Sequence, residues 1–178
     1  NLEDARVAVA AGADLLGFIF YAKSPRYVIP GPAAAIVRAL REDRERMSQG
    51  EKSKQQVVPS PKVVGVFVNA SVAEIEAMIA TVGLDYVQLH GNETTEWFSA
   101  LGQRAFKAVR PADGAAAQAE AEQFAPLGCA AGPCLMIDAY DPQVYGGTGK
   151  QTDWQVAAAL ARQYPGLLLA GGLTPANV

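Results

Sequence analysis

Residues 62–89 read KVVGVFVNASVAEIEAMIATVGLDYVQL, and this stretch decides the fold class. Lys62–Phe67 and Tyr86–Leu89 are short apolar runs, and Val72–Thr81 between them has the pattern of an amphipathic helix. Ser71, with a glutamate three residues later, has the spacing of a capping box that opens this helix. Strands that are apolar throughout are typical of a parallel sheet buried under helices. The stretch therefore predicts a β-α-β unit.

The same alternation of helix and strand continues on both sides of this unit. The expected strands are Leu15–Tyr21, Lys62–Phe67, Tyr86–Leu89, Ala105–Val109, Cys134–Ile137 and Gly166–Ala170; the expected helices are Glu3–Ala11, Pro32–Arg41, Val72–Thr81, Thr94–Leu101, Ala115–Phe124, Asp153–Gln163 and one starting at Thr174. An open doubly wound sheet fits this pattern, but an α/β (β/α)₈ TIM barrel fits better, because a chain that starts in a helix and stops at a helix start lacks the outer pieces of such a barrel. We expect a single barrel domain over residues 1–178, incomplete at both ends, with the first strand and the last β/α unit absent.

One segment departs from the alternation. Residues 42–61, EDRERMSQGEKSKQQVVPSP, are charged and polar, with almost no aliphatic side chain before Val57. This composition is typical of a mobile loop, so we expect a flexible charged insertion without a functional role.

Composition limits the partners and the compartment. The 178 residues carry a net charge of −3, which argues against nucleic acid or an anionic membrane as the partner. No apolar run approaches the roughly 20 residues of a membrane helix, and no signal peptide is visible, so we expect a cytoplasmic protein. Cys129 and Cys134 are expected to be reduced thiols, and with a single histidine in the chain we expect no metal site.

In a parallel barrel the active site lies at the carboxyl ends of the strands, so the polar residues that follow each apolar run are the candidates. They are Lys23, Ser24, Arg26, Asn69, His90, Arg110, Asp138 and the pair Gly171–Gly172.

Four of these positions have a specific chemical interpretation. Asp138, half desolvated at a strand end, could have the raised pKa of a general acid, or could brace a loop. Arg26 could pair with a substrate carboxylate or phosphate, or form a surface ion pair. Gly171–Gly172 before a helix could bind phosphate, or form a tight turn. His90, as an isolated histidine, is more often structural than functional.

Taken together, GADLLGFIFYAKSPRYV, VGVFVN, LDYVQLHGNE, LMIDAY, YGGTGKQTDW and LLLAGGLTPANV resemble the phosphoribosylanthranilate isomerase family, in that order and at suitable separations. The resemblance implies an isomerase of tryptophan biosynthesis. Its reaction is the Amadori rearrangement of N-(5-phosphoribosyl)anthranilate to 1-(2-carboxyphenylamino)-1-deoxyribulose 5-phosphate, which needs neither cofactor nor metal. It implies a small-molecule substrate and leaves open a homodimer or fusion to another tryptophan-pathway domain.

The resemblance also assigns roles to residues. Asp138 would protonate the furanose ring oxygen as general acid, Arg26 would hold the anthranilate carboxylate, Gly171–Gly172 would bind part of the phosphate, and His90 would contact the substrate. The family's general base is a cysteine on a strand that would precede Asn1, and neither cysteine of this sequence is at that position.

Two other functions compete with this interpretation. A related barrel enzyme such as indole-glycerol-phosphate synthase would need lysine and glutamate at strand ends, where this sequence has Asn69 and Asp138. A non-catalytic sugar-phosphate-binding remnant would explain the absent cysteine, but not the retained Arg26, Asp138 and glycine pair.

Overall fold

The computed structural model describes residues 1–50, 61–139 and 153–177. The chain divides into two compact units, Asn1–Val66 with Ala73–Tyr86, and Phe67–Val72 with Val87–Val178, which we call unit 1 and unit 2. The elements in chain order are α1 (Leu2–Ala10), β1 (Leu15–Ile19), α2 (Pro30–Gly50), β2 (Lys62–Phe67), α3 (Val72–Met78), the π-helical η1 (Ile79–Gly83), β3 (Tyr86–Leu89), α4 (Thr95–Leu101), the 3₁₀ turn η2 (Gly102–Arg104), β4 (Ala105–Val109), α5 (Gly114–Phe124), the 3₁₀ turn η3 (Ala125–Leu127), β5 (Leu135–Ile137), α6 (Trp154–Gln163) and β6 (Leu167–Leu169).

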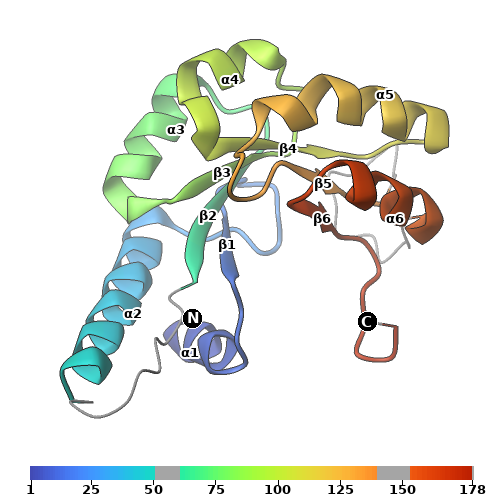
Figure 1. Ribbon diagram of the computed structural model, residues 1–178. Helices are drawn as coiled ribbons and strands as arrows, with labels where there is room; N and C mark the ends of the chain where they lie inside the picture. The colour runs from blue at the N-terminus through green and yellow to red at the C-terminus, as the bar shows by residue number, and fades with distance from the viewer. Residues whose placement is uncertain (51–60, 140–152, 178) are drawn as a thin grey trace. The chain divides into compact units, whose positions relative to one another are not determined.

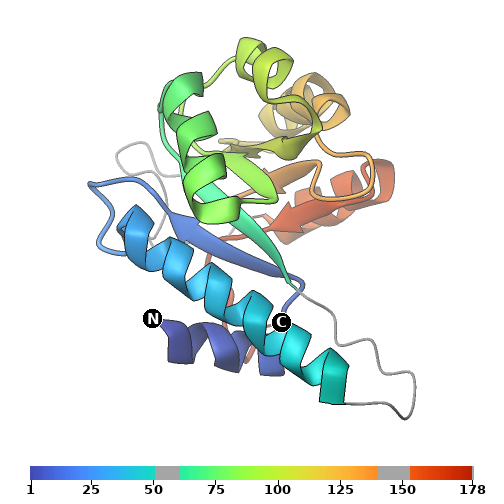
Figure 2. The same ribbon diagram turned by 90° about the vertical axis from the view of Figure 1, so that its left-hand side faces the viewer.

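Unit 1 contains two parallel strands and the helical segments α1, α2, α3 and η1, of which α1 and α2 lie side by side. β1 pairs with β2 so that Leu15 lies opposite Lys62. α1 runs beside α2, as Figure 2 shows, and Arg6 of α1 forms an ion pair with Asp43 of α2 at 2.8 Å. η1 also packs on α2, where Arg41 donates to the carbonyl oxygen of Gly83 at 2.7 Å. The long helix α2 therefore contacts both α1 and η1.

The expectation of a loop from residue 42 is wrong for its first part, because α2 continues to Gly50. The charges that suggested a solvated loop are placed at helical spacing. Arg46 pairs with Glu42 at i,i+4 and with Asp43 at i,i+3. Such pairs stabilise an exposed helix by a few tenths of a kcal/mol each. The rest of the expected insertion, residues 51–60, lies outside the described residues.

Unit 2 contains parallel strands paired in the order β3-β4-β5-β6. β4 lies between β3 and β5, and all five of its residues are buried. Helices α4 and α5 cover one face of these strands (Figure 1), and the rings of Phe98 and Phe124 from the two helices lie 5.9 Å apart. Burial of β4 at every position explains why the strand sequences are mostly apolar.

The strands at 62–67, 86–89 and 105–109 have the predicted bounds, whereas the end of the described chain differs. Thr174–Asn177 forms a turn, in which Asn177 accepts from the backbone N–H of Thr174 at 2.6 Å, and the expected helix is not formed within the described residues. Among those residues, none of the helices has the length and apolar character needed to span a bilayer.

Candidate active site

The carboxyl ends of the strands in unit 2 bring His90 and Asp138 together. His90 follows β3 and Asp138 follows β5, and both backbones extend the hydrogen-bond ladder of the sheet. The N–H of His90 donates to Phe67 O at 2.8 Å, and the N–H of Asp138 donates to Val109 O at 2.9 Å. Because side chains alternate between the two faces of a strand, Gln88 and His90 share a face, as do Met136 and Asp138.

Both side chains are buried, and their polar atoms meet. Nε2 of His90 lies 3.2 Å from Oδ2 of Asp138, within ion-pair distance, and has no partner among the described residues that meets strict hydrogen-bond geometry. The other carboxylate oxygen, Oδ1, accepts from the backbone N–H of Ala139 at 2.8 Å. On its other side, the ring of His90 meets Gln88, whose Nε2 lies 3.0 Å from Nδ1.

These contacts reverse the expected shift in the pKa of Asp138. Burial raises the pKa, as the sequence suggested, but the contact with His90 and the N–H of Ala139 lower it more, with a smaller contribution from the charge of Arg110. The net result is a pKa below the ordinary value of 3.8. The carboxylate is therefore ionised at neutral pH, and the expectation of a raised pKa is wrong for the unliganded chain.

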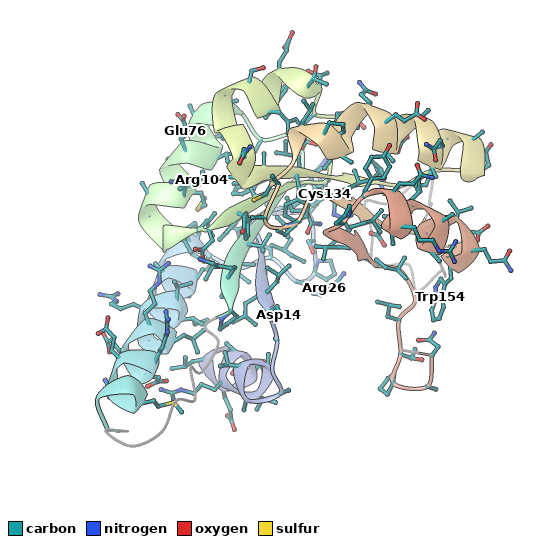
Figure 3. The ribbon with its side chains drawn as sticks, viewed as in Figure 1. Asp14, Arg26, Glu76, Arg104, Cys134 and Trp154 are labelled. Carbon is teal, nitrogen blue, oxygen red and sulfur yellow. The ribbon has the colours of Figure 1, made fainter. Side chains whose placement is uncertain are left out.

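Arg26 lies in unit 1, in the exposed loop that follows β1 (Figure 3). The loop is held by its own backbone: the N–H of Arg26 donates to Ser24 Oγ at 3.2 Å, and the N–H of Val28 donates to Ile19 O at 2.9 Å. The guanidinium forms no ion pair with any residue that the structure describes. The alternative of a surface ion pair is therefore not seen in this part of the chain, and the charge is available to a ligand.

Gly171 and Gly172 follow β6 after Ala170 and adopt φ values of +94° and +66°. Only glycine takes up such angles at little cost, so the tight-turn interpretation is confirmed. The turn is held by Asn177, whose side-chain amide donates to Gly172 O at 3.0 Å. The N–H groups of both glycines donate to no described residue, which leaves them available for an anion.

A second polar cluster lies on the opposite face of the sheet, under the helices. Lys107 in β4 and Glu93 in the loop after β3 form a buried ion pair at 2.8 Å. Nζ of Lys107 also donates to the carbonyl oxygens of Leu89 at 3.3 Å and Gly91 at 2.7 Å, the residues on either side of His90. Glu93 in turn accepts from the N–H of Gly91 at 2.8 Å and of Asn69 at 2.7 Å.

This pair is structural in its placement. Lys107 is level with Leu89 in the β3–β4 register, so both point away from the face that carries Gln88 and His90. Its Nζ lies 6.0 Å from the ring centroid of Phe124 on α5. Burial lowers the pKa of Lys107, although Glu93 raises it in part. The side chain of Lys107, with the Glu93 carboxylate that it binds, thus lies on the face of the sheet opposite to His90.

The rule that selects polar residues after each apolar run did not predict a role for Gln88, Lys107 or Glu93. The first two were hidden inside apolar runs, YVQL and AFKAV, where a polar residue is unusual. That contrast was the available signal, because a polar side chain in a buried strand needs a partner.

The two cysteines lie away from this site. Both thiols are free, as expected. Cys134 precedes β5 at its amino end, where its N–H donates to Gly166 O at 3.2 Å, and its side chain appears in Figure 3. Burial raises the pKa of the Cys134 thiol, which makes it a poor base at neutral pH. No group of three or more His, Cys, Asp or Glu that could hold a metal is found among the described residues.

Comparison with known proteins adds a family to this geometry. Residues 35–178 match the family model described as N-(5'-phosphoribosyl)anthranilate (PRA) isomerase. The chain is 42% identical to the N-(5'-phosphoribosyl)anthranilate isomerase of Citrifermentans bemidjiense and 40% identical to that of Geobacter sulfurreducens. Both alignments cover 100% of this chain, with 74% and 75% of the respective relatives.

Solved structures agree with the sequence matches. The phosphoribosyl anthranilate isomerase of Thermotoga maritima has a TM-score of 0.76 at 30% identity, over 100% of this chain and 76% of that one. A second structure, of phosphoribosyl anthranilate isomerase in complex with reduced 1-(o-carboxyphenylamino)-1-deoxyribulose 5-phosphate, has a TM-score of 0.71 at 29% identity, over 99% of this chain and 74% of that one. These likenesses confirm the predicted α/β barrel fold class.

Proposed function

The chain belongs to the N-(5'-phosphoribosyl)anthranilate isomerase family, and from this we infer that it is an isomerase of tryptophan biosynthesis acting on a small-molecule substrate. The reaction is the Amadori rearrangement of N-(5-phosphoribosyl)anthranilate to 1-(2-carboxyphenylamino)-1-deoxyribulose 5-phosphate. The observation that best supports the site assignment is the buried contact of 3.2 Å between His90 and Asp138 at the carboxyl ends of β3 and β5.

Asp138 is the general acid in this proposal. It gives a proton to the furanose ring oxygen, so that the C–O bond breaks and the ring opens to a Schiff base. The unliganded carboxylate is ionised, so it must gain that proton in the substrate complex. Bound substrate excludes water and brings a phosphate and a carboxylate, and both effects raise the pKa of a nearby acid.

Four further residues serve binding in the same proposal. Arg26, whose guanidinium is free of ion pairs among the described residues, holds the anthranilate carboxylate through its planar fork of donors. The N–H groups of Gly171 and Gly172 bind part of the phosphate. His90 lines the substrate site and holds the acid by its contact with Asp138.

The general base is a separate matter. After ring opening, a base must remove the proton from C2 of the sugar, so that the enol-amine can form and become the ketone. The family resemblance assigns this role to a cysteine on a strand before Asn1, a position outside this sequence. Cys134 does not replace it, because it lies at the amino end of β5 and Asp138 at the carboxyl end.

The assembly and location of the enzyme belong to the same proposal. One similar structure is described as generated monomers of a dimeric phosphoribosylanthranilate isomerase from Thermotoga maritima, with a TM-score of 0.73 and 30% identity over 100% of this chain and 74% of that one. We infer that this chain also forms a homodimer, in the cytoplasm, where small-molecule biosynthesis takes place. Light scattering coupled to gel filtration tests the dimer.

The function is tested by turnover of freshly generated phosphoribosylanthranilate, followed as loss of anthranilate fluorescence. We would measure the 178-residue chain beside a version extended at both ends, each with and without Asp138→Asn. Loss of a general acid lowers the rate roughly 10²- to 10⁴-fold. The matched control is Asp14→Asn, an exposed aspartate before β1, which should leave the rate unchanged. Turnover that survives Asp138→Asn, or that is absent from both lengths of chain, would reject the proposal.

A further inference from the structure

Gln88 is a buried polar residue to which the mechanism above gives no task. Gln88 is 6% exposed and lies in β3, a strand whose other side chains are apolar or aromatic. Its amide Nε2 lies 3.0 Å from Nδ1 of His90, two residues further along β3 and on the same face. Burying an amide is costly unless it is hydrogen-bonded, and the ring of His90 is the partner that the fold provides.

The contact determines where the proton of His90 sits. In this orientation of the amide its NH₂ group faces Nδ1, and because an NH₂ group only donates, Nδ1 of His90 accepts with its lone pair. A neutral imidazole carries a single N–H, which is then on Nε2. Nε2 is the atom that lies 3.2 Å from Oδ2 of Asp138. A carboxylate only accepts, so this tautomer places a donor against an acceptor.

The opposite tautomer would be unfavourable at both ends of the ring. Nδ1–H would face the NH₂ group of Gln88, donor against donor, and the amide would have to turn over to present its oxygen. The lone pair of Nε2 would face the carboxylate of Asp138, acceptor against acceptor. Both contacts are buried, so water cannot relieve them, and the low local dielectric strengthens the repulsion.

We propose that Gln88 is a positioning residue that fixes His90 in the Nε2–H tautomer and thereby orients the carboxylate of Asp138. The proposal rests on the proposed function for the role of Asp138, but its physical content, the tautomer, is independent of activity. Gln88 acts through His90 and is not one of the groups described as contacting the carboxylate of Asp138.

The experiment exploits the fact that His90 is the only histidine in the chain. With ¹⁵N-labelled histidine, a long-range ¹H–¹⁵N correlation spectrum reports the tautomer of this one ring, without assignment of other signals. We would record it for the parent chain, Gln88→Glu, Gln88→Met and the matched control Gln103→Glu, which adds the same charge at an exposed position. Circular dichroism verifies that each variant folds.

We expect Nε2–H in the parent chain and in Gln103→Glu. In Gln88→Glu the new carboxylate accepts at Nδ1, so the ring should become Nδ1–H or doubly protonated. In Gln88→Met the preference should be weakened to a mixture. In a version of the chain that turns over substrate, Gln88→Glu should lower kcat at least tenfold and change KM by a smaller factor, because Arg26 and the glycine pair are untouched.

An Nδ1–H ring in the parent chain would overturn the proposal, and this result needs no variant to fold. An Nε2–H ring that persists unchanged in both Gln88 variants would also overturn it. If the tautomer changes as expected but no version of the chain turns over substrate, the positioning role stands and the proposed function fails. Unchanged kcat in Gln88→Glu, with the tautomer altered, would remove the link to Asp138.

Discussion

Asp138 holds a charge that the folded chain stabilises, so its contribution to stability depends on pH. Burial raises its pKa, but the contact with His90 and the N–H of Ala139 bring the pKa below 3.8. A group whose pKa is depressed by folding binds more protons in the unfolded chain. Its stabilising contribution is complete above the unfolded pKa and is lost as pH falls through the folded pKa.

Replacing this carboxylate should therefore flatten the acid limb of the stability curve. We expect Asp138→Asn to lower the free energy of unfolding at neutral pH, and to lose less of it than the parent between about pH 5 and about pH 3. Urea unfolding across this range measures the difference. Asp14→Asn serves as control, and its curve should parallel that of the parent. A variant Asp138→Asn whose curve is also parallel would show that the carboxylate is not stabilised in the fold.

At the scale of the single residue, the sequence predicted where a side chain lies in the fold better than it predicted which groups surround that side chain. His90 and Asp138 were both selected because each follows an apolar run, and the structure brings them to 3.2 Å. The direction of the Asp138 pKa shift was predicted wrongly, because it depends on donors that come from a different strand and from the next backbone N–H. Such contacts are set by tertiary packing, which spacing along one strand does not reveal.

At the scale of the element, the loop that carries His90 is held by side chains on the opposite face of the sheet. Lys107 donates to the carbonyl oxygens of the residues before and after His90, and Glu93 accepts from the N–H of Gly91. Gly91 has no room for a side chain, since an added Cβ would lie 2.7 Å from the backbone nitrogen of Asn69. Two strand-end loops are therefore fastened together around one buried ion pair.

Replacing one partner of the Lys107–Glu93 ion pair should lower the free energy of unfolding far more per residue than replacing both. Lys107→Met leaves Glu93 as an uncompensated buried charge, and Glu93→Gln leaves Lys107 as one. Each substitution should destabilise the chain by about 3–5 kcal/mol. The double variant should lose much less than the sum, because no charge remains unpaired. Chemical denaturation of the four proteins in this cycle gives the coupling. Strictly additive losses would mean that the two side chains stabilise the fold independently.

Elements were predictable where burial is uniform and less so where charges pair. The strands 62–67, 86–89 and 105–109 were located correctly because each is a short apolar run bounded by polar or turn-forming residues. The end of α2 was misplaced because charged residues at i,i+3 and i,i+4 spacing have the composition of a loop but the pairing of a helix. The helix expected at Thr174 is a turn within the described residues, held by Asn177.

At the scale of the whole molecule, burial is distributed unevenly along the chain. β4 is buried at every residue and has a strand on each side, whereas α1 contains no buried residue. β6 is intermediate, since all three of its residues are partly exposed. His90, Asp138 and the glycine pair belong to unit 2, so the acid and the proposed phosphate site share the unit that contains the most buried strand.

Uneven burial predicts a gradient of local stability, because segments with few buried apolar contacts open at lower free energy than the core. In native-state hydrogen exchange followed by mass spectrometry, we expect peptides from β4 to exchange slowest, at a rate set by global unfolding. Peptides from β6 should exchange faster, and those from α1 fastest, through local opening. Lys107→Met should accelerate β4 far more than α1, because β4 exchanges through global unfolding, which loss of the ion pair makes easier, whereas α1 exchanges through local opening. If α1 exchanged as slowly as β4, its exposed helix would have to be stabilised by something other than the packing described, and burial would not be what sets the order of opening in this chain.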